Sequence, residues 1–166
     1  SNTLAAFWLI SYGSGSAATS KQKRWLPVIR GAITLYMFMT GVIFAILLAP
    51  IEDAVLTAVP IDNIILHYVM PAALVLDWLL FPSRARITLR QSLLWLIVPV
   101  AYVLYSLVRG AIVHWYPYPF LNASKSGYAH VLGTTVILLI GVLAMSWLLR
   151  WLPSIIRHTE QLTNKL

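Results

Sequence analysis

Four long apolar stretches limit what this chain can fold into. A helix needs about 20 mostly apolar residues to cross the hydrocarbon core of a bilayer. Four stretches meet this need, at residues 28–49, 64–81, 89–108 and 129–152. Charged residues make up 10% of the chain, whereas an ordinary soluble domain carries about 25%. We therefore predict an all-α fold, a polytopic bundle of transmembrane helices that forms one domain over residues 1–166.

Residues 1–12, SNTLAAFWLISY, are also apolar but too short to cross a bilayer. As a helix they would rise about 18 Å, against a hydrocarbon core of about 30 Å. They also lack the initiator methionine, basic region and cleavage site of a signal peptide. We therefore expect an N-terminal truncation, in which these residues form a partial first span whose start lies upstream of this chain.

Basic residues gather at alternate ends of the predicted spans. Three groups share one predicted side of the membrane: Lys21, Lys23, Arg24 and Arg30; Arg84, Arg86 and Arg90; and Arg150, Arg157 and Lys165. The connections on the other side hold only Arg109 and Lys125 as cations. Because cytoplasmic loops of membrane proteins are rich in Lys and Arg, we predict that the three groups and the C-terminal tail are cytoplasmic. The net charge of +7 then reflects topology, and no nucleic-acid partner is expected.

The predicted span 64–81 contains a histidine, a proline and an aspartate. Polar side chains are costly inside a membrane helix, so each is a candidate functional residue. Pro71 has no N–H for the carbonyl of His67, which predicts a free carbonyl and a kink. Asp77 lies roughly 15 Å deeper than His67 along a helix, too far for a direct pair. We therefore predict a functional His67, and Asp77 as a structural hydrogen-bond anchor between helices.

Other polar residues are predicted at the depth of His67, in the outer half of the membrane. The candidates for lining a substrate pocket are Ser1, Asn2, Arg109, Tyr118, His130 and Thr134. Each also has a plain structural interpretation, since threonines bond their own helix, terminal cations extend to the interface and aromatic residues line it. Cysteine is absent and no two histidines have helical ligand spacing, so neither a metal site nor a cofactor is predicted.

Several motifs occur in an order that is typical of one family. They are His67, Pro71, an acid ten residues after the histidine, Pro82-Ser83-Arg84, and the segment Trp115-Tyr116-Pro117-Tyr118-Pro119-Phe120-Leu121. Together they resemble the androgen-induced-gene-like family of integral membrane hydrolases, over nearly the whole chain. Arg109-Gly110 and Ser1-Asn2 look most like its bacterial six-helix branch. The resemblance implies a bacterial plasma membrane protein whose first helix and part of the second precede Ser1.

The resemblance also implies an activity. The animal members cleave fatty acid esters of hydroxy fatty acids with a threonine and a histidine inside the membrane. His67 matches that histidine, and the matching threonine would fall upstream of Ser1. The hydroxyl would attack a lipid ester carbonyl with His67 as general base, and Asn2, Tyr118 or Arg109 would contact the developing charge. Membrane lipid and a lipid-like small molecule are thus the expected partners.

Two other functions fit the same residues. A transporter or accessory protein would use His67 and Asp77 as a proton or ion relay. A purely structural helical membrane protein requires only that the polar groups satisfy one another. The sequence assigns no oligomeric state.

Overall fold

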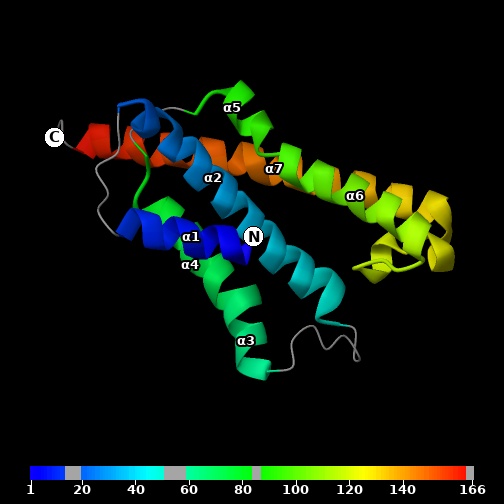
Figure 1. The fold of residues 1–166 in the computed structure, drawn as a ribbon. Helices are drawn as coiled ribbons and strands as arrows, with labels where there is room; N and C mark the ends of the chain where they lie inside the picture. The colour runs from blue at the N-terminus through cyan, green and yellow to red at the C-terminus, as the bar shows by residue number, and fades with distance from the viewer. Residues whose placement is uncertain (14–19, 51–58, 84–86, 164–166) are drawn as a thin grey trace.

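Long helices make up the structure. The computed structural model describes residues 1–13, 20–50, 59–83 and 87–163, and the side chains of 1–11, 25–50, 59–83 and 87–152. In these residues every regular element is helical (Figure 1). By length and composition, four helical stretches can cross a membrane: Trp25–Leu48, Pro60–Leu80, Leu89–Val113 and Ala123–Leu152. The predicted all-α bundle of membrane-span type is confirmed.

The predicted spans correspond to elements that are partly interrupted. The elements in chain order are α1 (Asn2–Gly13), α2 (Ser20–Ile43), η1 (Phe44–Leu48), α3 (Pro60–Ile64), η2 (Ile65–Val69), α4 (Met70–Leu80), α5 (Leu89–Leu94), α6 (Ile97–Val113), η3 (Pro119–Leu121) and α7 (Ala123–Thr163). The π-helix η1 continues α2, and α3, η2 and α4 form one helix with a π-helical middle.

A turn divides the predicted span 89–108 into α5 and α6. Pro99 has no N–H to donate to the carbonyl of Trp95, four residues earlier. In addition, the N–H groups of Trp95 and Leu96 donate to carbonyls three residues back, Ser92 at 3.2 Å and Leu93 at 3.1 Å, and not four residues back as in an α-helix. The tighter turn redirects the helix between Leu94 and Ile97, a change that the apolar pattern alone does not predict.

The C-terminal end of α6 and the N-terminal end of α7 differ from the predicted boundaries. α6 continues past 108 to Val113, so Arg109 lies inside the helix and not at its end. α7 begins at Ala123, before the predicted 129, and bends where Gly127 has a φ of 78°. Asn122 caps α7, because its Oδ1 accepts from the Lys125 N–H at 3.2 Å. The predicted connection 111–128 therefore shortens.

Some predicted features lie outside the described residues. They are most of the glycine- and serine-rich linker before α2, the acidic pair Glu52 and Asp53, the basic turn Arg84 and Arg86, and Lys165. The backbone of the tail continues α7 as a helix to Thr163.

Two buried tryptophans join four helices at one end of the bundle. Trp78 of α4 and Trp95, in the turn directly after α5, are each 1% exposed. The Trp78 Nε1 donates to the carbonyl of Leu149 in α7, and the Trp95 Nε1 to that of Val28 in α2, both at 2.9 Å. The Leu149 carbonyl can accept because Pro153 has no N–H for it. We call Trp78 and Trp95, with their two carbonyl partners, the tryptophan core.

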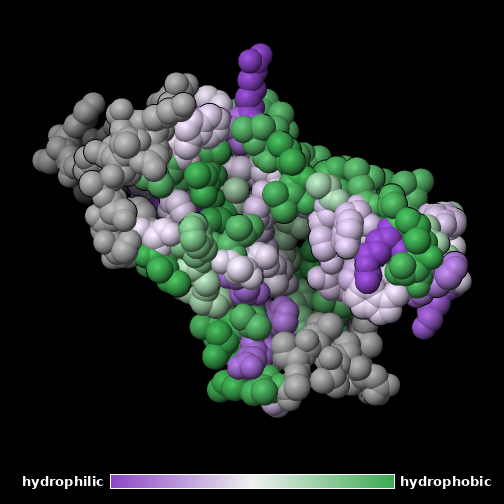
Figure 2. Space-filling view, in the orientation of Figure 1, coloured by the Kyte–Doolittle hydropathy of each residue, from purple (hydrophilic) through white to green (hydrophobic). Residues whose placement is uncertain are grey.

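Beyond the tryptophan core the helices separate. α6 and α7 lie side by side and extend away from α2 and α4 (Figure 1). α1 packs on α2 and α4 through Ala5, which is fully buried, and Trp8. Much of the remaining surface is apolar in the view of Figure 2, and Phe7 and Ile112 are each 72% exposed. Such a surface fits contact with lipid chains.

Candidate functional site

His67 lies at a widened turn of its helix. Pro71 follows the π-helix η2, where the N–H of Met70 bonds the carbonyl of Ile65, five residues back. The His67 ring stacks on Phe44 of the other π-helix, η1, with centroids 4.1 Å apart and planes at 14°. Tyr68 meets the same phenyl ring edge-on at 5.4 Å. Single π-helical turns occur frequently at functional sites, and here two of them contact each other through His67.

A hydrogen bond orients the His67 ring. Its Nδ1 lies 3.1 Å from the carbonyl oxygen of Asn63, one turn earlier. A carbonyl only accepts, so the Nδ1 is the donor, and the Nε2 takes no part in this bond. The side chain is half-buried. A neutral imidazole held in this way has its lone pair on Nε2, which is the form that acts as a general base.

The opposite helix approaches this kink very closely. A Cβ built on Gly41 of α2 would lie 2.9 Å from the Pro71 Cβ and 3.3 Å from the His67 carbonyl oxygen. This is the carbonyl that the sequence predicts to be free. A small residue at this position lets the backbone of α2 meet the kinked helix directly.

Gly41→Ala is expected to destabilise this contact. The added methyl group meets a rigid proline ring and a backbone oxygen, so the two helices must move apart, at a cost of about 1–3 kcal/mol. Gly141→Ala is the matched control, because a Cβ there has no neighbour within 4 Å. Thermal unfolding in mild detergent measures both variants. Equal melting temperatures for the two would argue against this packing.

Ser1 and Asn2 lie beside the same stretch of α2. The Ser1 Oγ is 2.8 Å from the Thr40 Oγ1, and Thr40 donates its own hydrogen to the Tyr36 carbonyl at 2.8 Å. Ser1 is therefore the donor in the hydroxyl pair. Thr40 precedes Phe44 by one helical turn and so shares its face of the helix. The structure thus places Ser1 and His67 against one face of α2.

Two amide oxygens near these residues have unused hydrogen-bonding capacity. The Oδ1 atoms of Asn2 and Asn63 are buried and lack a partner within the described part of the chain. A buried polar atom without a partner costs about 1–3 kcal/mol. Asn63 follows the start of α3, one turn before His67, and was not singled out from sequence. Its spacing of four residues from a candidate histidine is a signal that would have identified it.

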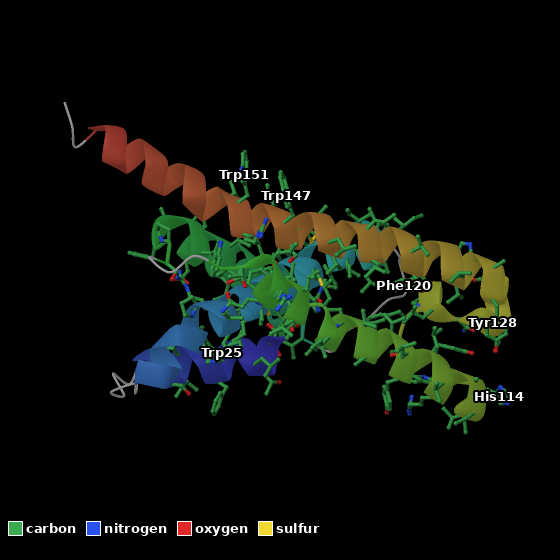
Figure 3. All side chains as sticks on the ribbon, turned by 90° about the horizontal axis from the view of Figure 1, so that it is seen from above. Trp25, His114, Phe120, Tyr128, Trp147 and Trp151 are labelled. Atoms are coloured by element: carbon green, nitrogen blue, oxygen red, sulfur yellow. The ribbon has the colours of Figure 1, made fainter. Side chains whose placement is uncertain are left out.

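The remaining pocket candidates form a separate group where α6 ends and α7 begins. The Arg109 guanidinium lies 4.8 Å from the Trp115 ring centroid. Thr134 donates to the His130 carbonyl in its own helix at 3.0 Å, and the His130 side chain is exposed. Figure 3 shows this end through His114, Phe120 and Tyr128, and in Figure 1 it lies away from α3 and α4.

Tyr118 belongs to this second group. Its ring stacks on Phe120 with centroids 5.1 Å apart and meets Tyr102 at 6.3 Å. Burial, reinforced by Tyr102, raises the pKa of the Tyr118 phenol to about 12. The hydroxyl therefore keeps its proton at physiological pH. The structure brings Tyr118 to Arg109's end of the molecule, not to His67.

Asp77 is bound to Arg30 of α2. The carboxylate Oδ2 accepts from Arg30 Nη2 at 2.8 Å and from Nε at 3.0 Å. The guanidinium also donates to the carbonyls of Asp77 at 2.6 Å and Phe81 at 2.7 Å. Asp77 thus connects α4 to α2. A carboxylate already held by a guanidinium gives no support to a proton relay through it.

The charge pattern groups Arg30 with the loop cations, but Arg30 lies inside the span Trp25–Leu48. A cation and an acid near the same end of two neighbouring spans is a signal that would have paired it with Asp77. Among the side chains that the structure describes, no cluster of His, Asp or Glu could hold a metal ion.

The fold and these contacts define a multi-span helical integral membrane protein. Comparison with protein-family models, with curated proteins and with solved structures gave no match.

Proposed function

We propose that this protein is an intramembrane hydrolase of fatty acid esters and that His67 is its general base. The observation that carries the proposal is the orientation of the imidazole. Its Nδ1 is held by the Asn63 carbonyl and its face by Phe44, and neither contact uses the Nε2. The family resemblance supports the same residue and the same reaction.

In this reaction a hydroxyl attacks the ester carbonyl while the His67 Nε2 takes its proton. The threonine expected upstream of Ser1 would supply the hydroxyl. The protonated ring then returns the proton to the leaving alkoxide, and the acyl group stays on the threonine. Water, activated by the same nitrogen, releases the fatty acid. The amide N–H groups of Asn2 or Asn63 are candidates to stabilise the oxyanion.

We place this reaction in the plasma membrane of a bacterium, in the outer half of the bilayer, with the C-terminal tail in the cytoplasm. Arg30, Arg90 and Arg150 support this orientation, because they belong to three segments that meet at the tryptophan core. Positive residues mark the cytoplasmic ends of spans. The substrate would be a membrane lipid that enters sideways from the bilayer.

His67→Asn in the full-length protein is expected to lower long-chain ester hydrolysis by about 10²–10⁴-fold, because the variant lacks the base. His114→Asn is the matched control. It removes an imidazole at the far end of α6, where His114 has a φ of 54°, and asparagine tolerates that conformation. Hydrolysis of a p-nitrophenyl long-chain ester measures activity, with melting temperatures as a folding check. Equal activity in the two folded variants would overturn the proposal.

A further inference from the structure

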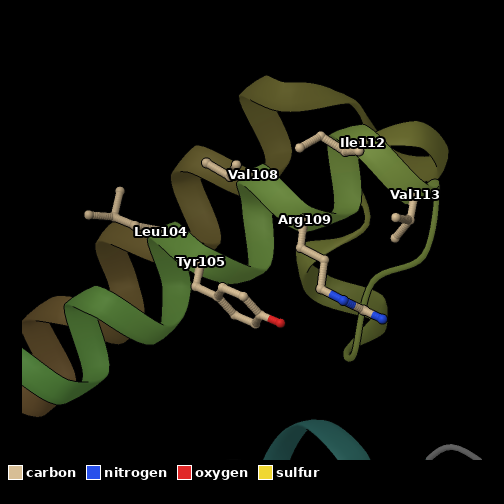
Figure 4. A pocket seen from close by; sticks show the side chains of 6 residues that line it. All are labelled: Leu104, Tyr105, Val108, Arg109, Ile112 and Val113. Atoms are coloured by element: carbon tan, nitrogen blue, oxygen red, sulfur yellow. The ribbon is translucent and has the colours of Figure 1, made fainter.

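A hollow lies on the outward face of α6. It has a volume of about 440 Å³ and is lined by Leu104, Tyr105, Val108, Arg109, Ile112 and Val113 (Figure 4). Leu104, Val108 and Ile112 recur at four-residue spacing and form an apolar stripe, and Tyr105, Arg109 and Val113 form the row beside it. Val108 is 62% exposed and Ile112 72%. The apolar stripe is therefore not covered by another helix of the described chain.

One charged group borders this apolar surface. The Arg109 guanidinium lies over the Trp115 ring, which fixes its position, and the side chain is half-buried. Within the described residues it makes no ion pair, and the carboxylate of Asp77 is already bound to Arg30. Figure 4 shows the Tyr105 hydroxyl and the Arg109 guanidinium on the same side of α6. A cation at the edge of the hydrocarbon without a carboxylate partner is costly, and an anion would neutralise it.

We propose that this hollow binds one anionic phospholipid of the surrounding membrane. The phosphate accepts from the Arg109 guanidinium, whose planar fork matches two phosphate oxygens. The Tyr105 hydroxyl is a further donor to the headgroup. One acyl chain follows the stripe from Val108 to Leu104, toward the membrane interior. This site lies on α6, apart from His67, and does not depend on the proposed hydrolase activity.

The choice of lipid rests on charge complementarity. The hollow is apolar along its length, and the Arg109 guanidinium lies at its border. A lipid with an anionic headgroup and a long acyl chain is complementary to both features. A soluble anion would use the guanidinium but leave the apolar stripe unfilled. A neutral lipid would fill the stripe but leave the charge unpaired. An anionic phospholipid satisfies both.

The test uses full-length protein purified in mild detergent and mixed with phosphatidylglycerol or phosphatidylcholine. Native mass spectrometry counts the lipid molecules that stay bound. Wild type is expected to retain one phosphatidylglycerol in preference to phosphatidylcholine. Arg109→Gln is expected to weaken this retention by about tenfold or more, the change in affinity that corresponds to the loss of one hydrogen bond to a charged group. Arg90→Gln, which removes an exposed cation from α5, is expected to leave retention unchanged.

A second variant keeps the charge and fills the hollow. Val108→Trp is expected to lower phosphatidylglycerol retention although Arg109 is intact. This variant still tests the proposed lipid site if Arg109→Gln fails to fold. Equal retention in wild type and in folded Arg109→Gln or Val108→Trp would overturn the proposal. So would displacement of the lipid by inorganic phosphate at an equal concentration, because that result would identify a site for a soluble anion.

Discussion

A Gly31→Ala variant is expected to lose about 3 kcal/mol of stability, the upper end of the usual cost of overpacking. A Cβ on Gly31 would overlap the Trp95 ring at its Cζ2 and lie 3.0 Å from the Trp78 Cη2. Neither ring can move aside easily, because both are 1% exposed and each indole N–H is bonded to a backbone carbonyl of another helix. The methyl group therefore separates α2 from α4 and α5.

Gly133→Ala is the matched control for this prediction. Gly133 lies within α7, and a Cβ there meets nothing within 4 Å. The same change should be neutral or stabilising, because alanine is favoured over glycine in a helix by about 1 kcal/mol. Denaturation of the folded protein by SDS from mild detergent micelles gives both free energies of unfolding. Similar stabilities of the two variants would show that the tryptophan core tolerates separation of these helices.

The positions of the spans could be predicted from sequence, but their ends and interruptions could not. Apolar length locates a membrane helix because the bilayer demands it. The ends depend on local partners, such as the Asn122 cap that starts α7 early. The turn between α5 and α6 lies four residues before Pro99, and the apolar pattern carries no signal for it. The acceptors of Trp78 and Trp95 lie 71 and 67 residues away in the chain, and no local pattern reveals such pairs.

The candidate site was partly accessible to sequence reasoning. The cost of a histidine in an apolar span singled out His67, and the missing N–H of Pro71 indicated a perturbed helix. The form of that perturbation, a π-helix facing a second π-helix at Phe44, depends on how two helices meet. Similar predicted depth also grouped Arg109 and His130 with His67. Residues at the same depth in a membrane can still lie far apart within its plane. Because α6 and α7 diverge from α4, Arg109 and His130 lie away from His67.

Asp77→Leu is expected to destabilise the protein by about 1–3 kcal/mol, because it leaves the largely buried Arg30 guanidinium without its carboxylate partner. The Arg30 side chain is 14% exposed and the Asp77 side chain 40%. Arginine cannot lose its charge, so the remaining guanidinium would stay charged without a counterion. Arg30→Met is expected to cost less, because the remaining carboxylate is 40% exposed and is not left buried without a partner. The two single variants should therefore differ, with Asp77→Leu the more harmful.

The double variant Arg30→Met/Asp77→Leu tests whether the pair acts as a unit. Replacing both charges by apolar groups removes the uncompensated charge, so the double variant should be more stable than Asp77→Leu alone. It should not recover fully, because Arg30 also donates to the Phe81 carbonyl and lies 5.3 Å from the Trp78 ring centroid. Arg90→Met, at an exposed position, controls for the loss of a cation. If the loss of stability in the double variant equals the sum of the losses in the two single variants, the ion pair contributes no coupling between α2 and α4.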